Sequence, residues 1–187
     1  MIVRRNLRST HYKKGQIWIS AALYTALGLI LITVILSVGM PFVNKITDRN
    51  TVLQSKNILL EMDKIIREVE LEGVGSRRPF FVEIQEGDFL IQGEDSIDQI
   101  GWTVISEEKL GIESGETVGQ LGPLIEEGNL KIQSTRVGQG YSIRMWIDYK
   151  ENSIDIESNL KQLSGQYNLI IEHRQNSGQD YVEIKEG

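Results

Sequence analysis

The chain has 187 residues, of which 20 are basic, 26 are acidic and 40% are apolar, and it contains no cysteine. This length and composition suit about one globular domain with an attached element. The lack of cysteine excludes disulfide frameworks, thiolate metal sites and cysteine nucleophiles.

Positive charge is concentrated at the N-terminus. Residues 1–14 contain no acidic residue and five basic ones: Arg4, Arg5, Arg8, Lys13 and Lys14. The rest of the chain therefore has 15 basic against 26 acidic residues, a net charge of −11. Such a charge repels phosphate backbones, so we expect no nucleic-acid partner.

An uncharged stretch follows the basic residues. The 30 residues 15–44 contain no Asp, Glu, Lys or Arg, and residues 17–38 are rich in Ile, Leu, Val and Ala. A membrane core of about 30 Å needs about 20 such residues as a helix. We therefore predict a transmembrane helix over residues 16–40. Because basic residues remain on the cytoplasmic side, we expect a cytoplasmic N-terminus and an extracellular remainder.

Two other interpretations explain this stretch less well. A secretory signal has an apolar part of about 7–15 residues before a small-residue cleavage site. Here the run is about twice as long and closes with Gly39-Met40-Pro41-Phe42. A buried core helix is the second alternative, but 30 uncharged residues would be unusual in a domain of this size.

The sequence Lys13-Lys14-Gly15-Gln16, directly before the apolar run, resembles the class III signal peptide of archaeal type IV prepilins. This resemblance implies a basic leader, residues 1–15, recognised through Lys13 and Lys14. A membrane prepilin peptidase would cut between Gly15 and Gln16 and leave the apolar helix in the mature protein. The alternative is an incidental glycine beside an ordinary membrane anchor.

One position departs from the wider pilin pattern. Ser20 stands at the fifth mature position, where bacterial pilins usually carry a glutamate that pairs with a neighbouring subunit. Archaeal relatives often lack this glutamate, so Ser20 favours the archaeal branch and weakens the expectation of a long filament. Ser20, Ala22 and Ala26 are small, and the last two are spaced i, i+4, which lets another helix approach closely. Lipid-facing alanine is the alternative.

The helix is expected to continue outside the membrane as an amphipathic extension over residues 41–75. Pro41 should kink or locally break it, because proline removes one backbone hydrogen bond. Gly73 and Gly75 should end it. The apolar stripe predicted to pack on the head consists of Phe42, Ile46, Leu53, Leu60, Ile65 or Ile66, and Val69.

Residues 76–187 should form an antiparallel β-sheet or sandwich, arranged as a meander, so the predicted fold class is α+β with a pilin-like N-terminal helix. Tight hairpins are predicted at Glu86-Gly87, Glu127-Gly128 and Asn176-Ser177-Gly178. Residues 141–149 alternate, and we expect both faces of this strand to be buried. The predicted strands are 80–85, 88–92, 102–105, 130–135, 141–149, 154–157, 167–173 and 181–185.

The sequence offers no chemistry that points to an enzyme. The acidic pairs Asp95 with Asp98 and Glu107 with Glu108 lack the ordered ligand pattern of a calcium loop. The glycine-rich residues 115–122 and 138–140 lack the lysine of a phosphate loop. We therefore predict no catalytic residues, cofactor or metal, and the absence of an Asn-x-Ser/Thr sequon predicts no N-linked glycosylation.

Together these features predict a structural subunit of a type IV pilus-like filament or pseudopilus. Its partners would be the membrane, the prepilin peptidase and other copies of its own helix, and its head would serve adhesion or surface contact. The alternative is an uncleaved, single-pass surface protein that does not polymerise.

Overall fold

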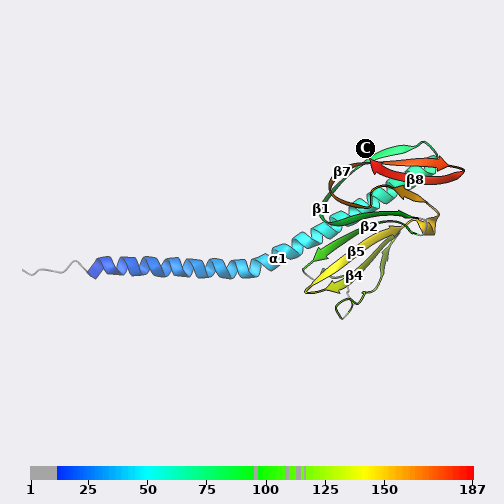
Figure 1. Ribbon diagram of the computed structural model, residues 1–187. Helices are drawn as coiled ribbons and strands as arrows, with labels where there is room; N and C mark the ends of the chain where they lie inside the picture. Colours follow the sequence, from blue (N-terminus) through cyan, green and yellow to red (C-terminus); the bar gives the residue numbers. More distant parts are fainter. Residues whose placement is uncertain (1–11, 95–96, 108–109, 113–114, 116) are drawn as a thin grey trace, which may run out of the picture. The chain divides into compact units, whose positions relative to one another are not determined.

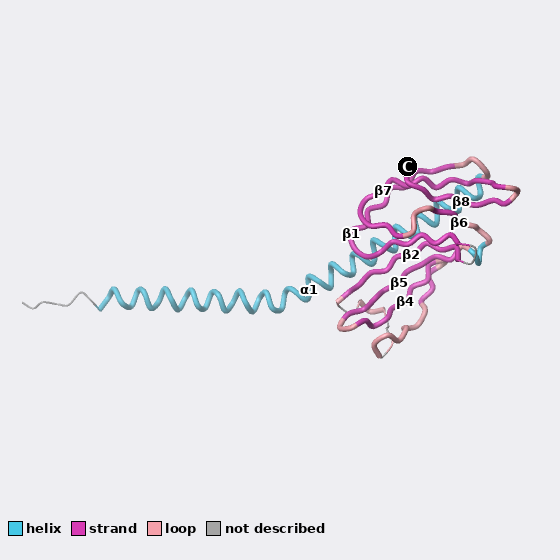
Figure 2. Tube along the Cα trace, viewed as in Figure 1, coloured by secondary structure: helices cyan, strands magenta, loops and turns pink. Residues whose placement is uncertain are grey.

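The computed structural model describes residues 12–94, 97–107, 110–112, 115 and 117–187. Its backbone contacts separate two units, Met1–Val43 and Asn44–Gly187. We call the second one the head unit. Helix α1 contributes to both, and every strand belongs to the head unit (Figures 1 and 2). One long helix and one large sheet confirm the α+β class.

Helix α1 extends from Tyr12 to Glu72, so it begins four residues before the expected start at Gln16. It continues through Pro41 without a gap, and the predicted local break is therefore wrong. Proline removes only one backbone hydrogen bond, and those of the adjacent turns hold the helix together. The kink remains a prediction.

The helix ends where the sequence predicted. Gly73 follows its last residue with φ of +92°, the left-handed conformation that glycine adopts without strain. The hydroxyl of Ser76 donates a hydrogen bond of 3.1 Å to the carbonyl oxygen of Val69 and so satisfies one of the free carbonyls of the last turn.

The buried side of α1 differs in part from the predicted stripe. Leu60 is half-buried, and Ile66 and Val69 are buried as expected, but Leu53 is 45% exposed. Phe42 and Ile46 are exposed too. Apolar residues stand side by side at 52–53, 59–60 and 65–66, so the sequence left open which member of each pair faces inward. The buried row advances by three and four residues: Val52, Ser55, Leu59, Met62, Ile66 and Val69.

A single eight-stranded sheet, in place of a two-sheet sandwich, covers the C-terminal half of the helix. Its order is β3-β4-β5-β2-β1-β7-β8-β6, which also differs from a simple meander. The strands are β1 (Arg77–Glu94), β2 (Ile97–Ser106), β3 (Ile125–Glu127), β4 (Leu130–Val137), β5 (Gly140–Asp148), β6 (Ile156–Ser158), β7 (Gln162–Asn176) and β8 (Gln179–Glu186), with a short 3-10 helix η1 (Lys150–Asn152) before β6.

The sheet is mixed, so the fully antiparallel prediction is wrong at one pair. Strand β8 pairs with β7 on one side and with β6 on the other. The chain reverses direction between β6 and β7, and again between β7 and β8. Two reversals restore the original direction, so β8 runs parallel to β6. The two strands pair because β8 lies between β6 and β7 in the sheet.

Strand β1 is one continuous strand, although a hairpin was predicted at Glu86-Gly87. The register with β7 shifts between Ile84 and Phe89, which marks a bulge. Gly87 has φ of +86°, and the indole N–H of Trp102 donates a hydrogen bond of 3.0 Å to the carbonyl oxygen of Glu86. A bulge and a hairpin both favour glycine with positive φ, so this dipeptide did not distinguish them.

The other two predicted hairpins are confirmed. Glu127 pairs with Leu130 across the β3–β4 turn, and Asn176 pairs with Gln179 across the β7–β8 turn. In the second turn Ser177 and Gly178 both have positive φ, at 51° and 87°. Positive φ at both central residues matches the twist of the flanking strands.

Strand β5 alternates as predicted but is buried on one face only. Ile143, Met145 and Ile147 belong to the core that the sheet shares with α1. On the opposite face Arg144 is exposed, and its guanidinium lies 5.1 Å from the centre of the half-buried Trp146 ring. The predicted burial of both faces is therefore wrong, because the single sheet has no second layer over this side.

Leu59→Ala should reduce the free energy of unfolding of the head unit by about 2–5 kcal/mol, because Leu59 is fully buried between helix and sheet. Leu53→Ala is the matched control, with an expected change of about 0.5 kcal/mol or less, because Leu53 is 45% exposed. Chemical denaturation of the full chain in detergent, followed by near-ultraviolet circular dichroism, measures both. Equal effects would contradict the helix orientation.

Gly87→Ala should destabilise the head unit more than Gly178→Ala. Both glycines have nearly the same φ, +86° and +87°, so both variants carry the same backbone strain. A Cβ at position 87 would lie 2.3 Å from the carbonyl oxygen of Thr103, whereas position 178 has open space. We expect a difference of roughly 1–3 kcal/mol in the same denaturation measurement. Equal loss in the two variants would argue against the bulge.

Candidate functional site

The N-terminal part of α1 is the most unusual surface of this protein. From residue 18 to residue 43, which we call the apolar segment, every side chain is exposed, and only Gly28 and Gly39 are half-covered. Helix α1 is the one described helix that is long and apolar enough to cross a membrane, and its most apolar window is not buried by the rest of the chain. A helix that is apolar on all sides is typical of a membrane span or a protein interior.

Three hydroxyl side chains within this segment form hydrogen bonds with the helix itself. The hydroxyls of Thr25 and Thr33 donate hydrogen bonds of 2.9 and 2.8 Å to carbonyl oxygens one turn earlier. Ser37 does the same to Val34 at 2.9 Å. Hydrocarbon offers no hydrogen-bond partners, so a spanning helix has to satisfy its hydroxyls in this way.

The residues of the predicted leader site all lie at the start of α1. Lys13, Lys14, Gly15 and Gln16 have helical backbone, so the structure places the predicted cleavage bond inside the helix. Residues 1–11, with the other basic residues, lie outside the described part of the chain.

The three predicted packing residues do not share one side of the helix. Ser20, Ala22 and Ala26 are all exposed. Ala22 and Ala26 lie one turn apart on one face, as their spacing predicts. Ser20 precedes Ala22 by two residues and therefore faces a different direction. Only the alanine pair forms a common surface for another helix.

Polar contacts at residues 48–56 attach the helix to the sheet, and no sequence pattern predicted them. The hydroxyl of Ser106 donates a hydrogen bond of 2.6 Å to the carboxylate of Asp48. Thr51 donates to Glu86 at 3.2 Å, and Lys56 forms an ion pair with Glu127. The partners are 35 to 71 residues apart in sequence, so only the fold brings them together.

A buried carboxylate lies further along the same helix. Asp63 accepts hydrogen bonds from Arg67 at 3.0 and 3.1 Å, and from Asn129 in the β3–β4 turn at 3.2 Å. Burial, and then the charge of Asp63, raise the pKa of the fully buried Tyr149 well above its ordinary value of 10, so this phenol stays neutral. These groups are polar attachments between helix and sheet.

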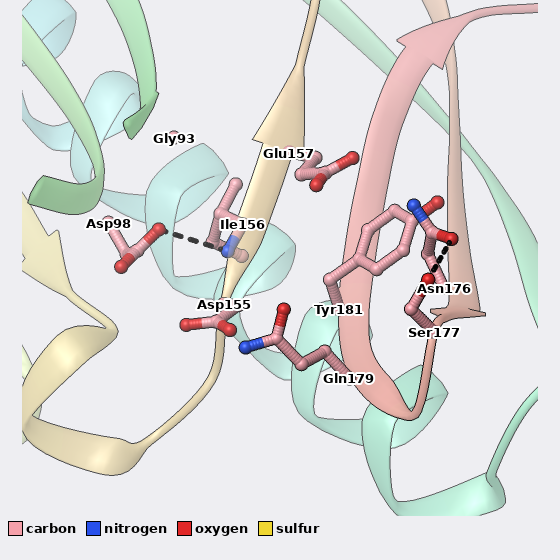
Figure 3. A pocket seen from close by; sticks show the side chains of 9 residues that line it. All are labelled: Gly93, Asp98, Asp155, Ile156, Glu157, Asn176, Ser177, Gln179 and Tyr181. Atoms are coloured by element: carbon pink, nitrogen blue, oxygen red, sulfur yellow. Dashed lines mark hydrogen bonds between the residues drawn. The ribbon is translucent and has the colours of Figure 1, made fainter. Parts of the chain in front are cut away.

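A polar hollow of the head unit lies at the β6 edge and has a volume of about 460 Å³. In Figure 3, Ile156 and Asp155 lie between Asp98 of β2 and the β8 residues Gln179 and Tyr181. Asp98 accepts a hydrogen bond of 3.1 Å from the backbone N–H of Ile156. The lining is acidic and amidic: Gly93, Asp98, Asp155, Ile156, Glu157, Asn176, Ser177, Gln179 and Tyr181.

Burial raises the pKa of the Asp98 carboxyl above its ordinary value of 3.8. The nearby negative charge of Asp155 adds to this rise, and the hydrogen bond from Ile156 opposes it. The sequence held one hint of this environment, because Asp98 alternates in step with the buried Ile100 and Trp102.

Among the residues that the structure describes, no group of three His, Cys, Asp or Glu side chains is placed to hold a metal ion. Of the acidic pairs considered from sequence, Asp98 is buried and Glu107 is exposed. Their neighbours Asp95 and Glu108 lie outside the described residues.

The chain matches no protein-family model, no curated protein and no solved structure. The chemistry of the helix and the head unit is therefore the basis for a functional proposal.

Asp98→Asn should leave the head unit as stable as the wild type at about pH 3 and more stable at about pH 7. Because the pKa of Asp98 is raised by folding, the folded state binds more protons, so wild-type stability falls as the pH rises through this range. The amide keeps an oxygen to accept from Ile156. Urea unfolding at both pH values measures the difference.

Glu157→Gln in the same hollow is the control for Asp98→Asn, because Glu157 is exposed and its replacement should change stability little. A loss of stability in Asp98→Asn at neutral pH would contradict this account of the hollow.

Proposed function

We propose that this protein is a pilin-like structural subunit whose apolar helix is inserted in the membrane and packs against the same helix of other copies. The observation that carries the proposal is the complete exposure of the apolar segment. The core of the head unit uses helix residues only from Val52 onward, so it closes without this segment.

Exposed apolar surface at this density needs a covering. Each buried Å² of apolar surface is worth about 25 cal/mol, and this segment presents apolar side chains on every side. Lipid can cover all of its faces at once. The same helix of another copy can cover one face. Ala22 and Ala26 mark the face at which two helix backbones approach most closely.

The charge distribution supports an orientation. Arg4, Arg5, Arg8, Lys13 and Lys14 precede the apolar segment, and such a cluster stays on the cytoplasmic side. The head unit is then extracellular. Its acidic surface disfavours nucleic acid and suits contact with other surfaces or proteins, a structural role without catalysis.

The leader supports processing. Lys13 and Lys14 before Gly15 and Gln16 follow the pattern that a prepilin peptidase recognises, and cutting after Gly15 would remove the positive charges that hold the N-terminus in the cytoplasm. The apolar segment would then be able to leave the bilayer when neighbouring helices replace the lipid.

One observation favours the alternative of an uncleaved single-pass anchor. Helix α1 starts at Tyr12 and continues through Gly15, so the bond to be cut lies within helical backbone. A protease requires a locally extended chain, and here the first turn would have to unwind. Whether the leader is cleaved therefore distinguishes the pilin-like subunit from the uncleaved anchor.

The mature chain should begin at Gln16, as read by N-terminal sequencing or intact mass of the membrane-extracted protein. Gly15→Val should abolish this processing, because a β-branched side chain at the cleavage position hinders access to the backbone and stiffens it. Gly28→Val introduces the same residue inside the apolar segment and should leave processing intact.

Electron microscopy of sheared cells then tests assembly. Filaments are expected for the wild type and are not expected for the unprocessed Gly15→Val variant. A mature chain that still begins at Met1 would establish the anchor instead.

A further inference from the structure

Cleavage of the leader creates a new charge at the start of the apolar helix. A cut after Gly15 removes all the basic residues that precede it, but it also leaves a free amino group on Gln16. Such a group is protonated at neutral pH. The mature helix therefore begins with one ammonium, shortly before the apolar segment.

The sequence offers no carboxylate to pair with this ammonium. The first acidic residue of the whole chain is Asp48, which comes only after the apolar segment has ended. A neighbouring copy that covers the apolar segment with its own brings no acid either, because the two sequences are the same. An unpaired charge is costly to move from water into apolar surroundings, so the ammonium opposes the packing of one apolar segment on another.

The helix itself adds to this cost. The backbone is helical at Gln16, and α1 continues from there without a gap to Glu72. The aligned peptide dipoles of a helix give its N-terminal end a partial positive charge, so an ammonium at this end meets a charge of the same sign. Any modification that removes the terminal charge relieves this repulsion.

The residue at the new terminus is one that can remove the charge by itself. We propose that Gln16, once it is released by cleavage, cyclises to pyroglutamate, so that the apolar helix enters an assembly with an uncharged end. This modification rests on the proposed function, because only a chain cut after Gly15 has Gln16 at its terminus.

The reaction needs no reagent beyond the residue. The neutral form of the amino group attacks the Cδ carbon of the same glutamine, and the bond between Cδ and the amide nitrogen breaks. The attacking nitrogen gives one proton to the leaving nitrogen, which departs as ammonia. The product is a lactam, whose nitrogen is part of an amide and carries no charge at neutral pH.

Helical backbone does not oppose this ring closure. The ring consists of N, Cα, Cβ, Cγ and Cδ of the first residue, so no backbone torsion of Ile17 or of a later residue has to change. The N–H groups of the first helical turn have no carbonyl partner within the helix, so no helical hydrogen bond is lost.

Intact mass of the membrane-extracted protein tests the ring. The mature wild type should weigh about 17 Da less than residues 16–187 with a free amino terminus, which is the mass of one ammonia. Edman sequencing should give no first residue until pyroglutamyl aminopeptidase removes the ring, and should then begin at Ile17. Extraction and digestion are kept cold, because the same closure proceeds slowly in a warm sample.

Gln16→Asn is the matched control, because its side chain is one methylene shorter and a four-membered lactam is too strained to form. This variant should be cleaved, keep its free amine and give several-fold fewer filaments in sheared cells. Adding Ser20→Glu to Gln16→Asn should restore the filament yield, because residues 16 and 20 lie one turn apart on the same helix face and the new carboxylate can pair with the ammonium.

A wild-type chain that is cleaved but retains an open Gln16 would overturn the inference and leave the proposed function standing. A chain that still begins at Met1 would overturn both. Equal filament yields for the wild type and a cleaved Gln16→Asn variant would overturn the role of the uncharged end.

Discussion

The structure depends on one helix, α1, of which one part packs against the sheet and the other is exposed. From Val52 onward a sheet of the same chain covers one side of α1, and that side carries the core residues. In the apolar segment the described residues of the chain leave every position exposed except the half-covered Gly28 and Gly39. The residues between these parts, Asn44–Thr51, include Lys45, Asp48 and Arg49, which belong in water or among headgroups. The charge pattern along one continuous helix thus distinguishes an exposed apolar part, a charged part and a part that belongs to the protein core.

The attachment of helix to sheet combines apolar packing with a few polar contacts. Apolar packing alone tolerates rotation of a helix, and α1 has apolar residues on neighbouring faces. Asp63 restricts this freedom, because its buried carboxylate accepts a hydrogen bond from Asn129, which lies outside the helix in the β3–β4 turn. Asp48 adds a second fixed point at Ser106. Polar contacts of this kind favour the orientation in which both partners meet.

Local features of this fold could be predicted from the sequence, and non-local ones could not. Gly73 ends the helix, and the turns at Gly128 and Gly178 form hairpins, because each depends on the conformation of one or two residues. The parallel β6–β8 pair depends on where β8 is inserted, and the hollow beside Asp98 gathers residues from β1, β2, β6, β7 and β8. The uncharged run 15–44 predicted the membrane candidate because its length is set by the bilayer and needs no tertiary contact.

The edges of the sheet are the places at which a strand of another copy could pair. The two outermost strands, β3 and β6, have three residues each, which leaves little backbone for another strand to join. Among the described strands, Arg77–Ile84 of β1 pair only with β7, and Pro79 interrupts this longer edge because it has no N–H to donate. Arg77 and Arg78 add charge there. A head unit with such protected edges disfavours growth of the sheet from one copy to the next.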